Sequence, residues 1–155
     1  METFGITRTK TPIAYDWRDG PLARMIRARL QDADLRPTRQ RVSLAGLLFV
    51  AGDRHFSAEQ LYHEAKALRM PLSLATVYNT LRQFASAGLI REIALYGSTV
   101  WYDTKTGPHS HYYDEDRQLL SDIPFDLTGD LNIKPPPGRK IVGVDVIVRI
   151  RDDDA

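Results

Sequence analysis

Residues Ser73 to Gly88 read SLATVYNTLRQFASAG, and this stretch predicts a short amphipathic helix. Ser73 is a good N-cap, because its hydroxyl can accept a hydrogen bond from a backbone amide of the first turn. Gly88 stands where helices commonly end in the left-handed conformation. The apolar stripe that should face a core consists of Leu74, Val77, Leu81 and Phe84.

The opposite face of this helix carries side chains suited to reading a nucleic acid. They can hydrogen-bond base edges and phosphates, or touch a thymine methyl. They are Thr76, Tyr78, Asn79, Thr80, Arg82 and Gln83. The alternative is a helix face that is simply solvated and binds no partner. The pattern of the neighbouring elements decides between DNA binding and this alternative.

The pattern around this helix predicts a winged helix-turn-helix. Three more helices are expected over about residues 21–33, 38–51 and 57–70, the third opened by the capping-box sequence Ser57-Ala-Glu-Gln60. Two strands, 89–94 and 99–103, should flank a turn at Tyr96-Gly97-Ser98. Compact helices followed by a hairpin are typical of this domain, whose last helix enters the major groove. The buried stripe expected for the first helix is Leu22, Met25, Ile26 and Leu30.

The second half of the chain predicts a small sheet after a connector at 104–111. Strands are expected over 111–115, 118–123 and 140–150, the last with Val142, Val144, Val146, Val148 and Ile150 on one face. So small a segment should pair with a second copy, which places two reading helices on an inverted repeat. We therefore expect an α+β chain: a flexible N-terminal arm (1–20), a winged helix-turn-helix DNA-binding domain (21–103) and a small α/β dimerisation domain (104–155).

Charge and composition are consistent with this division. The net charge is only +1, but residues 1–103 hold 14 Lys and Arg against 10 Asp and Glu, whereas residues 104–155 hold 7 against 10. This asymmetry indicates that the first half faces a polyanion, unless its arginines are simply solvated. The absence of cysteine excludes disulfides, thiolate zinc sites and thiol catalysis. No signal peptide or membrane-spanning run is visible, which predicts a cytoplasmic protein without a membrane partner.

A candidate metal site lies near the junction of the two halves. His109 and His111 are two residues apart, so in an extended segment both imidazoles point to the same side, about 7 Å apart. Asp103 and Asp122 lie nearby in sequence, and His55 could reach the same junction from a helix entrance. Such a nitrogen and oxygen set suits iron, manganese or zinc and would not suit calcium. The alternative is a pair of solvated loop histidines.

Three motifs resemble a known family in their order and spacing. They are Leu35-Arg-Pro-Thr-Arg-Gln-Arg41, His55-Phe-Ser-Ala-Glu-Gln-Leu-Tyr62 and Ser73-Leu-Ala-Thr-Val-Tyr-Asn-Thr-Leu81. Over roughly residues 22–123 the chain resembles the ferric uptake regulator (Fur) family of bacterial metal-responsive transcription factors. Within that family it looks most like the iron response regulator (Irr) branch, on the evidence of Trp101-Tyr-Asp103, the run 107–113 and the missing cysteines.

The resemblance implies roles for individual residues. Ser73, Tyr78 and Asn79 would meet bases and phosphates, Arg36 would lie near an A·T-rich minor groove, and Arg41 would hold a phosphate. With the polar helix face, the predicted DNA-binding set is Arg36, Arg41, Ser73, Thr76, Tyr78, Asn79 and Arg82. The family's regulatory site for Fe²⁺, Mn²⁺ or Zn²⁺ corresponds to His55, Asp103, His109, His111 and Asp122.

Departures from the family pattern shape the remaining expectations. The structural zinc that relatives hold on four cysteines should be missing, since the matching positions near Asp114 and Arg117 lack them. The branch implies a homodimeric regulator of iron homeostasis, active when iron is scarce and inactivated by haem, with His109 and His111 left as haem ligands. The alternative is a repressor that uses Fe²⁺ or Mn²⁺ as corepressor.

Two functions of other classes are also weighed. A metal-dependent hydrolase would need a substrate pocket that nothing in the sequence supplies, so we expect no enzyme. A winged-helix interaction module would show no salt-dependent binding to any duplex.

Overall fold

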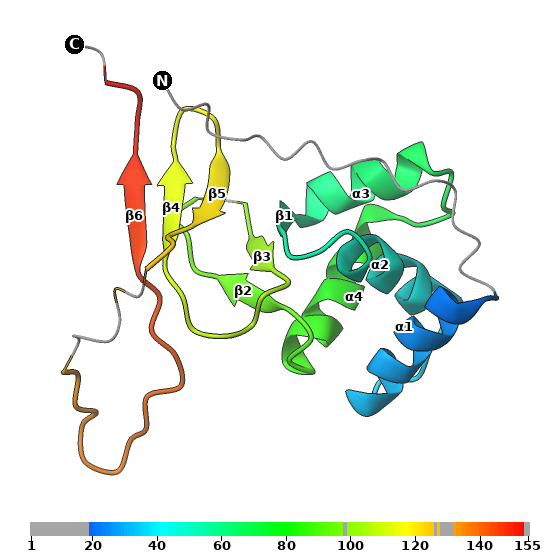
Figure 1. Ribbon diagram of the computed structural model, residues 1–155, viewed down its shortest axis with the longest axis horizontal. Helices are drawn as coiled ribbons and strands as arrows, with labels where there is room; N and C mark the ends of the chain where they lie inside the picture. The colour runs from blue at the N-terminus through cyan, green and yellow to red at the C-terminus, as the bar shows by residue number, and fades with distance from the viewer. Residues whose placement is uncertain (1–18, 98, 126, 128–131, 154–155) are drawn as a thin grey trace.

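The computed structural model describes residues 19–97, 99–125, 127 and 132–153. Four helices form one side of the described molecule and two three-stranded sheets follow (Figure 1). The helices are α1 (Pro21–Asp32), α2 (Arg39–Phe49), α3 (Ala58–Ala67) and α4 (Leu74–Ser86). The strands are β1 (His55–Ser57), β2 (Arg91–Ile93), β3 (Trp101–Asp103), β4 (His111–Asp114), β5 (Leu119–Asp122) and β6 (Ile147–Ile150). The expected α+β class is confirmed.

Side-chain caps fix where the helices begin. Thr38 accepts a hydrogen bond from the amide of Arg41, and Ser73 accepts one from the amide of Thr76. Ser57 and Gln60 form both bonds of the predicted capping box. α4 ends before Gly88, whose φ of 73° is the left-handed conformation expected there. The helix starts predicted from cap residues are thus confirmed.

The helical lobe buries one apolar core, and three expectations about which residues face it are wrong. Its buried members include Ile26, Leu30, Leu48, Phe56, Leu61, Val77, Leu81 and Phe84. Met25 is 53% exposed, because the buried face of α1 runs through Ala23, Ile26 and Leu30 instead. Leu74 is 36% exposed, since it is the first residue of α4. Thr80, expected on the polar face, is buried and donates its hydroxyl to the carbonyl of Thr76.

The first sheet has the strand order β1-β3-β2, with both pairings antiparallel. β2 and β3 form the predicted hairpin, although Ser98 of its expected turn lies outside the described residues. β1 was not predicted. β1 lies in the segment before α3 and pairs with β3, so that Phe56 lies opposite Tyr102, 46 residues further along the chain.

The second sheet has the order β5-β4-β6, with β4 antiparallel to β5 and parallel to β6. β6 covers only four residues of the stretch expected as a strand from 140 to 150. Val142 is 90% exposed and pairs with no strand of the described residues, so the predicted strand is wrong at that end. Among its described residues this lobe has strands as its only regular elements, not the α/β mixture expected.

The two lobes touch through side chains of both sheets. Ile93 and Trp101 of the first sheet pack against Leu120 of the second. Arg91 of β2 donates to the carbonyls of Gly107 and Val144 and pairs with Asp145. These contacts hold the ends of β3, β4 and β5 close together. Residues 1–18 of the arm expected at 1–20 lie outside the described part of the chain. None of the described helices is long and apolar enough to cross a membrane.

Candidate metal centre and nucleic-acid face

Five side chains converge where the two sheets meet. His55, Asp103, His109, His111 and Asp122 each offer one ligand atom, and these atoms lie within 4.8 Å of one another. They come from β1, β3, the connector, β4 and β5 in that order. The structure therefore brings together the whole set predicted from the sequence, including His55, which lies in the short strand β1 that leads into α3.

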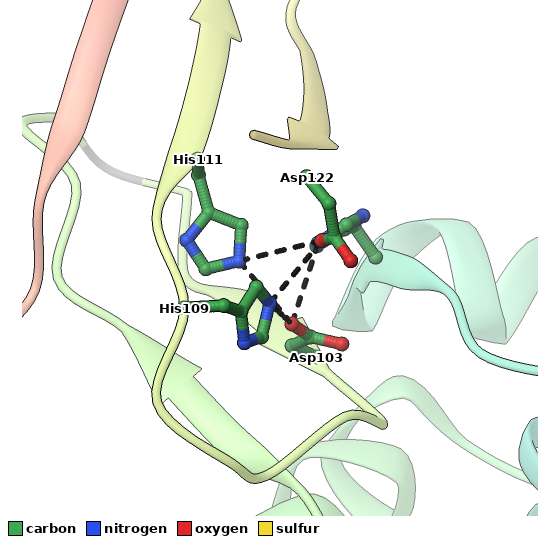
Figure 2. Close-up of side chains that lie close together, drawn as sticks. Asp103, His109, His111 and Asp122 are labelled. Carbon is green, nitrogen blue, oxygen red and sulfur yellow. Dashed lines mark hydrogen bonds and ion pairs between the residues drawn. The ribbon is translucent and has the colours of Figure 1, made fainter. Parts of the chain in front are cut away.

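Strand pairing explains why these residues meet. His55 lies opposite Asp103 in the first sheet, and His111 lies opposite Asp122 in the second. Residues directly opposite in antiparallel strands place their side chains on the same face. Each sheet thus presents one histidine and one aspartate to the junction, and the fifth residue, His109, joins them from the segment before β4. Figure 2 shows how Asp103, His109, His111 and Asp122 point toward one another.

The imidazole nitrogens all face two carboxylate oxygens. Asp103 Oδ2 lies 3.3, 2.8 and 3.2 Å from the Nε2 atoms of His55, His109 and His111. Asp122 Oδ1 lies 3.0, 3.2 and 3.9 Å from the same three atoms. The site is closed: His111 and Asp103 are 0% and 1% exposed, and only Asp122, at 35%, reaches solvent substantially.

The cluster fits a divalent transition metal. Ligands bound at about 2.1 Å are separated by about 3.0–3.4 Å along the edges of an octahedron or tetrahedron, close to most of the distances above. Nε2 of His55 and Nε2 of His109 are buried and make no hydrogen bond to any of the described residues, despite their proximity to oxygen. Such nitrogens are costly unless something else satisfies them, and a metal ion does so. Nδ1 of His109 lies 2.8 Å from the carbonyl of Gly107, a contact that leaves Nε2 free to coordinate.

Asp103 is held ionised by its neighbours. Burial alone would raise the pKa of this carboxyl, but the hydrogen bonds from His111 and the amide of Lys105, together with the nearby imidazole of His55, outweigh burial and bring the pKa well below its usual range. A carboxylate that stays charged in a buried position is a ready metal ligand.

Some predicted DNA-binding residues are exposed, and others make contacts within the protein. Arg36, Asn79 and Arg82 are exposed. Arg41 is half-buried, and its guanidinium contacts the side chain of Gln83 and the carbonyl of Arg36, which links α2 to α4. The hydroxyls of Ser73 and Thr76 lie 2.8 Å apart at the start of α4.

Tyr78 has a partner that sequence reasoning missed. Its hydroxyl donates to Glu59 of α3, and this hydrogen bond raises the pKa of Tyr78 to about 12 and lowers that of Glu59. Glu59 is part of the predicted capping-box sequence, but that sequence gives no indication of a contact with Tyr78, which follows Glu59 by 19 residues. Gln83 was predicted to lie on the polar face, but the sequence did not indicate that its side-chain oxygen accepts hydrogen bonds from Arg41.

Fold and cluster together define a two-lobed protein, with a helical lobe of the winged-helix type and a candidate metal centre where it meets a small sheet. The model of the Ferric uptake regulator family matches residues 32–126. The chain belongs to this family.

Individual relatives cover different shares of the chain. It is 37% identical over 90 residues to the ferric uptake regulation protein of Pseudomonas fluorescens, covering 57% of this chain and 73% of that protein. It is 31% identical over 86 residues to the peroxide-responsive repressor PerR of Staphylococcus aureus, of which it spans about half the length, 56%. The structure of the ferric uptake regulator from Pseudomonas aeruginosa with manganese superposes with a TM-score of 0.66 at 26% identity, covering 83% of this chain and 98% of that one.

Proposed function

We propose that this chain is a metal-dependent, DNA-binding transcriptional regulator that acts as a homodimer on an A·T-rich inverted repeat. Fe²⁺ or Mn²⁺ would bind to His55, Asp103, His109, His111 and Asp122 as the corepressor. The observation that carries the proposal is the convergence of these five ligands from both lobes within 4.8 Å. Residues 21–103 would bind DNA, and residues 104–155 would dimerise.

The position of the cluster supports coupling between metal and DNA. A bound ion would link the first sheet, whose strands β2 and β3 follow the reading helix α4, to the second sheet, which would carry the dimer contact. The ligands of both sheets then hold one arrangement of the lobes, and hence one separation of the two α4 helices. An ion that binds one arrangement better than others shifts the protein toward it, which couples metal binding to DNA binding.

The DNA face is supported by exposure and charge. Arg36, Asn79 and Arg82 offer exposed donors for phosphates and base edges, and Ser73 at the start of α4 is exposed as well. Arg41, Thr76 and Tyr78 complete the set of residues proposed to contact DNA. Within the protein they contact Gln83, Ser73 and Glu59, respectively, and these contacts fix their positions.

The corepressor proposal stands ahead of haem inactivation on chemical grounds. Nε2 of both His109 and His111 faces two carboxylates, and the two rings are 8% and 0% exposed. To serve as axial haem ligands these imidazoles would have to leave the cluster and make room for a planar macrocycle, whereas a small divalent ion needs neither change. The Irr-like behaviour, active under low iron and lost on adding haem, is the alternative outcome of the same test.

The test is fluorescence anisotropy of a labelled A·T-rich inverted-repeat duplex at fixed salt. Metal-stripped protein should bind weakly, and added Mn²⁺ should tighten binding. His109→Ala should abolish this response, while His63→Ala, which alters an exposed histidine of α3, should retain it. Tight binding without metal that is lost on adding haem would overturn the corepressor proposal in favour of the Irr-like one. No salt-dependent binding to any duplex would overturn both.

A further inference from the structure

Lys105 contacts the outer oxygen of both carboxylates in the cluster. Its backbone amide donates to Asp103 Oδ1 at 2.8 Å, and its ammonium donates to Asp122 Oδ2 at 3.0 Å. The other oxygen of each carboxylate, Asp103 Oδ2 or Asp122 Oδ1, faces the imidazoles. Lys105 therefore occupies one oxygen of each aspartate, and the other oxygen of each remains available to a metal ion.

Asp122 depends on this contact more than Asp103 does. The terminal torsion of an aspartate is broad and roughly two-fold, so burial or hydrogen bonds must select its orientation. Asp103 is 1% exposed and is enclosed by its neighbours, whereas Asp122 is 35% exposed at the end of β5. Within the described part of the chain, the ammonium of Lys105 is the group that contacts Asp122 Oδ2.

We propose that Lys105 is a positioning residue of the metal centre, which orients Asp122 so that Oδ1 faces the ion. This inference rests on the proposed metal site. Hydrogen-bond partners of metal ligands generally fix ligand orientation, and their removal commonly lowers metal affinity by about 10–100-fold. The neighbouring positive charge acts in the opposite direction, because an ammonium repels a cation. The sign of the mutational effect thus distinguishes positioning from charge alone.

The experiment measures Mn²⁺ affinity of the full chain from the loss of the free-ion EPR signal. Lys105→Met keeps the length of the side chain but removes its donor and charge, and the backbone bond to Asp103 survives the substitution. Its affinity for Mn²⁺ should fall about 10-fold. Lys105→Arg, which keeps donor and charge, should bind close to the wild-type value. Lys66→Met removes the same charge from an exposed site on α3 and should leave the affinity unchanged.

A second readout reports the geometry of the ligands. The visible absorption bands of bound Co²⁺ should change in Lys105→Met and stay as in the wild type in Lys105→Arg and Lys66→Met. Lys105→Met that binds Mn²⁺ as tightly as the wild type, or more tightly, would overturn the positioning role and leave the proposed function intact. Wild-type protein that binds no Mn²⁺ would overturn both.

Discussion

The hydrogen bond between Tyr78 and Glu59 gives a prediction that can be measured at a single atom. Glu59→Gln keeps the size of the side chain but removes the charge that opposes ionisation of the phenol. The pKa of Tyr78 should then fall from about 12 toward its ordinary value of 10.0. This difference corresponds to a change of up to about 100-fold in the acid dissociation constant. The fall should stop short of 10.0, because the desolvation that also raises the pKa remains.

The assay is a pH titration of tyrosine ring carbons by NMR in protein labelled at Tyr. The chain has seven tyrosines, so Tyr78→Phe identifies the resonance. Glu59→Gln combined with Tyr78→Phe is the matched control. The tyrosines other than Tyr102, whose pKa the charge of Glu59 also raises, should titrate in it as in Tyr78→Phe alone. A wild-type Tyr78 that titrates near 10, or one whose pKa is unchanged in Glu59→Gln, would refute the contact between α3 and α4.

The same contact makes stability depend on pH in a defined direction. A tyrosine whose pKa is raised by folding contributes stability that is fully present below pH 10 and is lost as pH rises toward about 12. The lowered pKa of Glu59 contributes stability that is present above pH 4.5 and is lost as pH falls below it. The wild type should therefore exceed Glu59→Gln in urea resistance between these limits, and the difference should shrink on either side.

Three further outcomes are expected. Ser57→Ala removes the capping box of α3 and should lower the free energy of unfolding by about 1 kcal/mol, measured as a shift in the urea midpoint with an unchanged slope. Asp103→Asn should differ from the metal-free wild type in acid stability. The contribution of Asp103 is present above pH 3.8 and is lost only as pH falls to its lowered pKa, so the two proteins should converge under strongly acidic conditions. Arg117→Ala breaks ion pairs with Asp114 and Asp152 and should speed amide exchange in β6, and high salt should bring the wild type closer to the variant because exposed pairs are screened.

Features with a local cause could be predicted from the sequence. Ser73 and Gly88 bound α4 because a cap hydroxyl and a left-handed glycine act within one turn. The pair His109 and His111 converges because alternation in an extended segment is also local. The position of His55 just before the capping box placed it near the same junction, and the family motifs then implied its role as a ligand.

Features that depend on contacts between distant segments could not be predicted from the sequence. β1 is three residues long and becomes a strand only because β3 lies beside it, so its own sequence carries little signal. The exposure of Met25 depends on which neighbours α1 meets, not on its period. Lys105 gave no signal as a contact of both aspartates, because the contact to Asp122 requires β5 to lie against the connector.

The cross-strand pairs at the junction have a consequence for how the chain folds. Because side chains alternate between faces, a slip of one residue in either sheet would turn His55 away from Asp103, or His111 away from Asp122. A newly made chain thus cannot bring together all five candidate ligands until β1 has paired with β3 and β4 with β5 in the native alignment. The last of these residues, Asp122, is available only after β5 has been synthesised. Metal retention would then act as a checkpoint on folding, since ion capture favours the correctly aligned molecule over its misaligned competitors.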